Sequence, residues 1–442
     1  MKYISIVLWI CIPMVALQAQ KQFSVEEAIS YGVTHHVKVK NAELDIRSAE
    51  KKVREVLGIG LPHLSAEGQF QHFIKIPTTV VPAKFFNPNA PDDALAELKF
   101  GTKYKLNGGA TLSQLLFNGS YLVGLEASKA FANTTRIMKE KTIQDIRHDI
   151  GRAYYTVLMI SENIKVVKEQ IDLTEKLRKE TMVLIEEGII EKSSVRQLDL
   201  SLLRLQDALT AMEGQRRAAK AVLKFNMGYP IKEKILLTND LEQKALQVRT
   251  LLPEDNPSFS KTPDMRLLAN QEMLQALNIK NAKAEYWPVL AVFLNYSNSA
   301  QRNSFDFFDK NGKWFPTALW GLNLSIPIYS GGMTKAKISQ ARIGRTKVQN
   351  SKMLLDQSLQ LRWTTALEGF HSAVTSFDRK VEAVKIAEEL YDSAKIKFKE
   401  GIMSSIELDQ TSTQRIKAEG DLMMARYKLV EARMELDYLL DR

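Results

Sequence analysis

Two short stretches of this chain repeat one pattern, LSQLLFNG at residues 112–119 and LSIPIYSG at residues 324–331. In both, a strand-like apolar stretch ends at a glycine, and a long segment without proline follows. The proline-free segments run from Tyr121 to Tyr229 and from Ile328 to Arg442. A repeat of over 200 residues is too long for a solenoid unit, so it predicts one domain built from two similar halves.

The first residues have the composition of an export signal. Lys2 precedes an apolar run from Ile4 to Val15, and a small-residue cleavage site ends at Ala19. We therefore expect residues 1–19 to be a signal peptide. Cys11, the only cysteine, lies inside it, so the mature chain is expected to form no disulfide. The rest of the sequence has no apolar run long enough for a membrane-spanning helix, so a membrane form would need a β-barrel.

The remaining composition argues against several function classes. The formal net charge of +10 is spread over helix-like segments with interleaved acidic residues, which is typical of a solvated surface and does not favour nucleic-acid binding. No acid–base pair, nucleophile or phosphate-binding glycine loop stands out, so we predict neither an enzyme nor a cofactor site. His35–His36 and Met423–Met424 are interpreted as helix polarity and core filling, not as metal ligands.

Apolar residues in the proline-free segments follow a heptad pattern. Ile143 starts a series with a spacing of seven, and a second series starting at Ile146 interleaves with it. This pattern is typical of helices that pack side by side as in a coiled coil. The segments 121–187 and 333–399 are each long enough for a helix of about 100 Å at about 1.5 Å per residue.

A helix of this length needs a partner along its whole length. The return helices, 194–225 and 405–440, reach about halfway, at about 1.5 Å per residue. The segments 25–59 and 263–286 are also helical in pattern and would cover the remainder. We therefore expect long antiparallel hairpins.

The turns of these hairpins have their own sequence signals. Gly188 and Gly401 suit a helix C′ position with positive φ. Two pairs, Ser194 with Gln197 and Ser404 with Glu407, are candidate capping boxes that restart the helix. Each hairpin is therefore expected to turn at a tip near residues 186–194 or 399–405.

Four segments alternate between apolar and polar residues with a period of two. They cover 64–70, 104–116, 290–296 and 320–328. Such alternation over about ten residues is typical of a transmembrane β-strand, although a soluble half-buried sheet shows the same pattern. We expect the apolar face to contact lipid through Leu106, Leu112, Leu290, Val292, Leu294, Trp320, Leu322 and Leu324.

The insertions 74–102 and 301–316 are long and rich in aromatic residues, which favours loops on the outer side of a membrane. Four strands cannot close a barrel, and open sheet edges are not tolerated in lipid. Two chains would supply about eight strands, whose interior side chains fill, whereas three would supply about twelve. We therefore predict a mainly α fold with a coiled-coil-like α-barrel, four strands per chain, and a twelve-stranded transmembrane β-barrel in a homotrimer.

The order and spacing of these motifs resemble the TolC-like outer-membrane efflux protein family across essentially the whole mature chain. The resemblance is carried by the two strand-to-helix blocks, which end at Gly119 and Gly331, and by the tip segments. The tips continue from Gly188 to Leu198-Asp199 and from Gly401 to Leu408-Asp409, as in the family pattern.

The resemblance implies a trimer in the cell outer membrane, with a helical tunnel in the periplasm that meets a periplasmic adaptor protein and an inner-membrane pump. It also implies that the segment 231–263 forms part of a belt around the helices. Two features depart from the family. The chain is net basic where the tunnel is often acidic, and glutamates replace the aspartates often found at the entrance.

We accordingly expect a signal peptide at 1–19, a first repeat at 20–230, the inter-repeat segment at 231–263 and a second repeat at 264–442. The expected function is a passive exit duct of a tripartite efflux or type I secretion system. The alternative is a periplasmic coiled-coil scaffold or adaptor without a barrel, and the strands discriminate between the two.

The candidate sites for adaptor contact lie at the two tips. The glutamates there either line the tunnel entrance or are solvated helix ends, and the apolar residues either dock an adaptor or pack against the neighbouring hairpin. The candidates are Glu186, Glu187, Gly188, Ile189, Ile190, Glu191, Glu400, Gly401, Ile402 and Met403.

Overall fold

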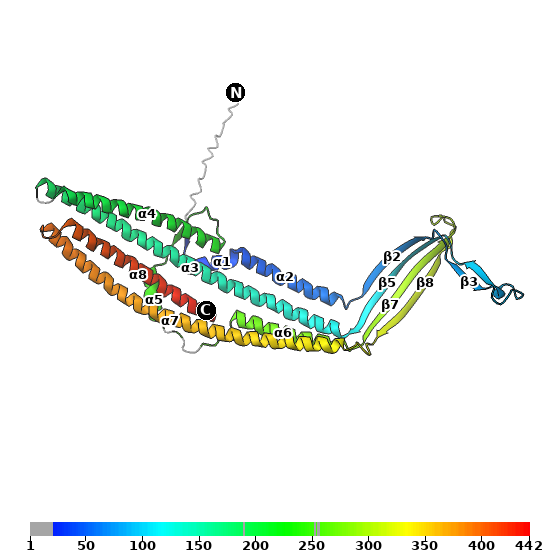
Figure 1. The fold of residues 1–442 in the computed structure, drawn as a ribbon. Helices are drawn as coiled ribbons and strands as arrows, with labels where there is room; N and C mark the ends of the chain where they lie inside the picture. The colour runs from blue at the N-terminus through cyan, green and yellow to red at the C-terminus, as the bar shows by residue number, and fades with distance from the viewer. Residues whose placement is uncertain (1–20, 189–190, 252, 254–256) are drawn as a thin grey trace, which may run out of the picture. The chain divides into compact units, whose positions relative to one another are not determined.

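A computed structural model describes residues 21–188, 191–251, 253 and 257–442 (Figure 1). The expected signal peptide and the tip residues Ile189 and Ile190 lie outside the described residues. The chain divides into two compact units. The first holds the described parts of Met1–Leu44, Arg136–Leu267 and Lys352–Arg442, and the second holds Asp45–Thr135 and Leu268–Ser351.

The predicted long helices are present in matched pairs. α3 (Gly119–Glu186) has 68 residues and α7 (Met333–Lys399) has 67, and both begin in the second unit. Their return helices α4 (Lys192–Met227) and α8 (Ser405–Leu440) have 36 residues each. Lengths that agree this closely between the halves confirm the helical part of the internal repeat.

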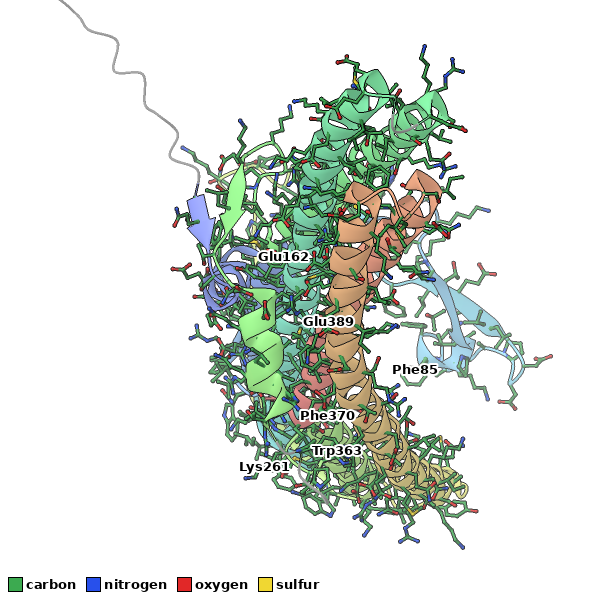
Figure 2. All side chains as sticks on the ribbon, turned by 90° about the vertical axis from the view of Figure 1, so that its left-hand side faces the viewer. Phe85, Glu162, Lys261, Trp363, Phe370 and Glu389 are labelled. Atoms are coloured by element: carbon green, nitrogen blue, oxygen red, sulfur yellow. The ribbon has the colours of Figure 1, made fainter. Side chains whose placement is uncertain are left out.

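The heptad positions form the core of the first unit. Ile150 and Val157 of α3 are fully buried, as is Leu429 of α8, and Trp363 and Phe370 of α7 belong to the same cluster (Figure 2). The cluster joins all four long helices to the shorter elements around them. The coiled-coil interpretation of the sequence is therefore correct for this unit.

The shorter elements of the first unit include one strand from the start of the first repeat and one from the inter-repeat segment. β1 (Lys21–Phe23) pairs in parallel with β6 (Ile235–Leu237). Helix α5 (Leu241–Arg249) packs against α8, and its Arg249 pairs with Asp378 of α7 at 2.9 Å. The inter-repeat segment thus contacts both helices of the second hairpin.

The predicted N-terminal helix is broken. α1 (Val25–His35) ends at a C-cap, His36, whose backbone is extended, and α2 (Val37–Gly58) follows. The added Cβ of an alanine at Gly228, where α4 ends, would lie 3.0 Å from the His36 Cα. His36 is therefore not the exposed helix residue that the sequence suggested, because it lies at this junction and is 9% exposed.

The second unit contains a four-stranded antiparallel sheet in the order β2-β5-β7-β8. Its strands are β2 (His63–His72), β5 (Tyr104–Asn118), β7 (Val289–Arg302) and β8 (Phe315–Ser325). Most of α6 (Pro263–Ala284) also belongs to this unit. All four predicted strands are confirmed. Among the described residues, no helix combines the length and apolarity that crossing a bilayer requires.

Two local expectations for this unit were wrong. The predicted last strand was to reach Ile328, but β8 ends at Ser325, because its partner β7 begins directly opposite, at Val289. The loop 74–102 contains its own hairpin, β3 (Thr78–Pro82) and β4 (Leu95–Lys99), with the single 3-10 turn η1 (Ala83–Phe85) between them.

Candidate channel surfaces

The sheet has one apolar face and one polar face. Directly opposed residues of antiparallel strands lie on the same face. Leu112 of β5 stands opposite Leu64 of β2 and Leu294 of β7, and Leu294 stands opposite Trp320 of β8. By this register, one face carries all eight residues expected to contact lipid: Leu106, Leu112, Leu290, Val292, Leu294, Trp320, Leu322 and Leu324.

The other face is mostly small and polar in the middle of the sheet. Thr111 stands opposite Ser65 and Asn295, and the Asn295 side-chain amide donates a 2.8 Å hydrogen bond to Thr111 Oγ1. An irregularity in β5 leaves Leu116 without a partner in β7, and Phe117 stands opposite Leu290 instead. Phe117 therefore occupies the place on the apolar face that the alternating pattern assigned to Leu116.

Both edge strands of the sheet, β2 and β8, have one unpaired side. β2 pairs only with β5, and β8 pairs only with β7, among the residues that the structure describes. Because each neighbouring pair is antiparallel, β2 and β8 run in opposite directions along the sheet. The β2 edge of one copy could therefore pair with the β8 edge of another in the same antiparallel manner.

The tip of the second hairpin is a well-defined helix end. Gly401 has a φ of +73°, and its N–H donates to the Phe398 carbonyl at 3.1 Å. The Ile402 N–H donates to the Lys397 carbonyl at 2.9 Å, which completes a Schellman motif. Gly188 at the first tip has a similar φ of +76°. Both glycine predictions are confirmed.

The helix restarts differ between the two tips. Ser404 and Glu407 form the predicted capping box, and hydrogen bonds from the Ser404 backbone and hydroxyl lower the pKa of the Glu407 carboxyl. The predicted pair of Ser194 with Gln197 is wrong. α4 begins at Lys192, its N-cap is Glu191, and Ser194 is buried inside the first turn.

The candidate tip residues separate into exposed and packed groups. Ile402 is 77% exposed, whereas Met403 packs against a small apolar cluster beneath the tips. That cluster contains Leu177 and Leu198 from the first hairpin and Tyr391, Ala394, Phe398 and Leu408 from the second. Met403 therefore has a structural role in joining the two hairpins, and Ile402 is the exposed apolar residue of this tip.

The tip glutamates lie on the surface of the helix ends. Glu186, Glu187, Glu191 and Glu400 are all exposed. Nearby, Lys399 pairs with Glu180 at 3.5 Å and so links α7 to α3. Within the described part of the chain, no three His, Cys, Asp or Glu side chains are placed to hold a metal ion.

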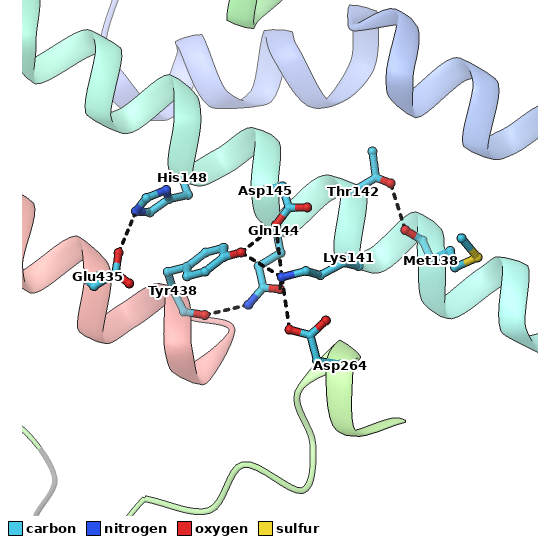
Figure 3. A network of polar contacts seen from close by, with 9 residues as sticks. All are labelled: Met138, Lys141, Thr142, Gln144, Asp145, His148, Asp264, Glu435 and Tyr438. Atoms are coloured by element: carbon cyan, nitrogen blue, oxygen red, sulfur yellow. Dashed lines mark hydrogen bonds and ion pairs between the residues drawn. The ribbon is translucent and has the colours of Figure 1, made fainter. Parts of the chain in front are cut away.

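A polar network holds the end of α8 against α3 (Figure 3). Lys141 Nζ donates to Tyr438 Oη at 2.8 Å, lies 3.1 Å from Asp145 and lies 3.3 Å from Asp264 at the start of α6. The Gln144 side-chain amide donates to the Tyr438 carbonyl at 2.6 Å. Burial alone would lower the pKa of Lys141, but the bonds to Tyr438 and Asp145 raise it above its usual value.

One further ion pair adjoins this network. His148 Nε2 lies 3.4 Å from a carboxylate oxygen of Glu435, and the hydrogen bond from His148 lowers the pKa of Glu435. These residues could not be singled out from the sequence, because isolated charges between heptad positions look like ordinary helix surface. One indication of this contact is present in the sequence. The segments of α6 and α8 together approach the length of α7, so they are expected to pack end to end along it and to meet there.

The chain is similar in sequence to known outer membrane proteins. The family model for "Outer membrane efflux protein" matches residues 259–441. The outer membrane protein TolC of Vibrio cholerae is 21% identical over 377 residues, which is 79% of this chain and 79% of that protein. The TolC of Salmonella enteritidis is 19% identical over 334 residues, covering 74% of this chain and 67% of its own length.

Solved structures match nearly the whole chain. The structure of CusC, which was solved to follow its folding and transmembrane channel formation, matches with a TM-score of 0.75 and 14% identity. The match covers 94% of this chain and 91% of the CusC chain. The open state of the MtrE outer membrane channel of Neisseria gonorrhoeae has a TM-score of 0.71 at 16% identity, with 94% and 88% covered. Residues 259–441 match the outer membrane efflux protein family, and the two curated relatives and the shared fold extend the likeness over most of the chain. The chain is therefore similar to the TolC-like outer membrane efflux proteins, and it is located in the outer membrane with its helical part in the periplasm.

Proposed function

We propose that the protein is the passive exit duct of a tripartite export system, assembled as a homotrimer with a shared twelve-stranded β-barrel. The observation that carries this proposal is the four-stranded sheet with one apolar face and two unpaired edges. Such a sheet is stable in lipid only when neighbouring copies close it. The antiparallel relation of β2 and β8 supports closure by copies related by rotation.

The number of copies follows from the size of the opening. Two copies would give about eight strands, and side chains fill the interior of such a barrel. Three copies give about twelve strands and leave space along the axis. The polar sheet face, with Ser65, Thr111 and Asn295, would then line the water-filled side.

We further propose that the hairpin tips dock a periplasmic adaptor, which connects the duct to an inner-membrane pump. The exposed side chain of Ile402 supports this, because an apolar residue at a solvated helix end gains from being covered by a partner. Glu187, Glu191 and Glu400 surround the same region with negative charge. Ile189 and Ile190 complete the proposed surface in the sequence but lie outside the described residues.

Substitution at Ile402 tests the docking step. Ile402→Glu is expected to reduce export strongly while the trimer remains intact, since the side chain has no intramolecular core to disturb. Ile402→Val is the matched control and should export normally. Met403→Glu should instead destabilise the tip, because Met403 packs against the cluster beneath it. Normal export by Ile402→Glu would overturn the docking proposal.

A fractionation experiment tests the duct itself. The duct predicts a heat-modifiable oligomer in outer-membrane fractions that forms ion-conducting pores in planar bilayers. An oligomer without conductance would contradict a water-filled interior. The alternative function, a periplasmic scaffold, has no specific observation in its favour.

A further inference from the structure

An aromatic cluster lies at the end of the sheet farthest along the strands from the helices. Phe70 of β2, Tyr104 of β5 and Phe305 of the β7–β8 loop contact one another, with ring centroids 5.7 to 6.2 Å apart. His72 stacks on Tyr104 at 4.6 Å, and Phe307 and Phe308 contact Phe305 at 5.7 and 6.3 Å. Six rings from three separate segments therefore form one surface, which we term the rim cluster.

The rim cluster is well packed at its centre and open on its outside. Phe307 is 5% exposed, whereas Phe305 is 60% and Phe308 is 89% exposed. Exposed phenylalanine side chains that are held together in this way favour an apolar partner. The loop that carries them is anchored, because Arg302 contacts Asp306 at 3.2 Å and the Lys313 carbonyl at 3.1 Å.

The register assigns the rim cluster to a face of the sheet. Phe70 stands opposite Leu106, and His72 stands opposite Tyr104. These pairs lie on the same side as Leu106 and Leu112, which is the apolar face. The rings therefore continue the apolar face toward its outer end, where aromatic side chains typically meet the lipid headgroups.

Unpaired cations accompany the rings. Lys103 Nζ lies 5.7 Å from the centre of the Tyr104 ring. Lys310 and Lys313 lie in the same loop as Phe308. Within the described residues, no ion pair involves any of these three lysines. Of the two aspartates in the loop, Asp306 pairs with Arg302, and Asp309 accepts a hydrogen bond from the Asn311 N–H at 3.0 Å. Apolar rings with the Lys103 ammonium beside them, and with two further lysines in the loop that carries Phe308, match an amphiphile that has acyl chains and a phosphate.

We propose that the rim cluster binds a phosphate-bearing lipid of the outer leaflet, with the rings against its acyl and sugar portion and the lysines near its phosphate. The proposal rests on the proposed contact of the apolar sheet face with lipid. A second copy of the chain is the less favoured occupant, because it would add to the β2 edge, whereas the rings stand on the face.

The test compares lipids in nanodiscs of defined composition. Purified trimer in phosphatidylcholine nanodiscs receives bisphosphorylated lipid A or the same lipid without phosphates, and thermal unfolding is recorded. Lipid A should raise the Tm of the wild type more than the dephosphorylated lipid does. Phe305→Ser combined with Phe308→Ser should remove the shift for both lipids, and a triple variant with Lys103, Lys310 and Lys313 changed to Gln should remove only the phosphate preference.

Matched controls exist within the same outer region. Phe85 is 84% exposed on the separate β3–β4 insertion, so Phe85→Ser should leave the lipid response unchanged (Figure 2). Lys99 of β4 is a control cation, and Lys99→Gln should behave as the wild type does. These controls separate a local lipid site from a general effect of surface hydrophobicity or charge.

Each result decides the proposal. Equal responses of the wild type and the ring variant would overturn it. Loss of the trimer by the ring variant in phosphatidylcholine alone would identify a second copy as the occupant and would also overturn it. If the wild type itself formed no heat-modifiable oligomer, the proposed duct would fail, whereas an oligomer indifferent to both lipids would refute only the lipid site.

Discussion

Replacing Leu112 by arginine places a charge on the face of the sheet that is proposed to contact lipid. Leu112 lies in the central strand β5, with Leu64 and Leu294 opposite it. The adjacent residue, Ser113, points to the other face and is also exposed, so Ser113→Arg is a matched control. The two variants carry the same charge one residue apart on the same strand.

The expected cost follows from the depth of the residue. An arginine on the lipid face of a membrane barrel destabilises it by about 2–4 kcal/mol near the bilayer midplane and by about 0–1 kcal/mol near the interfaces. Leu112 lies near the middle of the sheet, so the larger range applies. This corresponds to about a 30- to 700-fold loss in the folding equilibrium per chain, since about 1.4 kcal/mol is a factor of ten. Ser113→Arg should cost less than about 1 kcal/mol, because its charge stays in water.

The assay is folding into phospholipid vesicles under a urea titration, followed by the mobility shift between unheated and heated samples. Leu112→Arg should require markedly less urea to unfold than the wild type, and Ser113→Arg should unfold close to the wild type. Equal destabilisation by the two variants would refute the assignment of faces. Greater destabilisation by Ser113→Arg would mean that the polar face meets the lipid.

Three further predictions concern the helical part. Gly401→Ala should destabilise the protein by about 1–2 kcal/mol in thermal unfolding, because a φ of +73° is strained for an L-residue. The control Gly369→Ala lies inside a helix with open space for a Cβ and should stabilise the protein by about 0.5–1 kcal/mol. The reverse order would refute the role of Gly401 as the helix C′ residue. Lys141→Met should cost about 1–2 kcal/mol and speed hydrogen exchange at the end of α8, and unchanged exchange would contradict the network. Because the pKa of Glu435 is lowered, its pairing with His148 stabilises the folded protein above pH 4.5, and this stabilisation is lost as the pH falls and the carboxylate is protonated. In thermal unfolding, Glu435→Gln should therefore be less stable than the wild type at pH 7, by under about 1 kcal/mol, and equal to it at pH 3.

Much of the fold could be predicted, because its main signals are local and repeated. The heptad spacing sets the long helices, and glycine at a C′ position marks the tips. The helix α8 was predicted at Ser405–Leu440, which is where it lies. The alternating strands were likewise visible, since one face of each strand must be apolar.

The remaining features depend on contacts between distant segments. The helix break at His36 has no local signal, because it is tied to the end of α4 at Gly228. The irregularity at Leu116 depends on the register with β7, which the sequence of β5 alone does not contain. The β3–β4 hairpin was missed because its strands are short and a proline-rich segment separates them.

The candidate tip surface was predicted in part. Exposure of Ile402 agrees with the expectation that a tip residue has no core to enter. Met403 differs, because its packing partners come from both hairpins and their meeting could not be derived from either hairpin alone. The rim cluster was foreseen only as aromatic composition, since its ring contacts join three separate segments.

Disulfide trapping between sheet edges tests the central claim, a barrel shared by three chains, most directly. In a Cys11→Ser background, Ser65→Cys on β2 is combined in turn with cysteine at Thr317, Leu319 or Gly321 on β8, all on the polar face. The account predicts that at least one combination cross-links efficiently in outer membranes and gives a ladder that ends at three chains. A ladder that ends at two chains, or no cross-link between β2 and β8 in any combination, would contradict it.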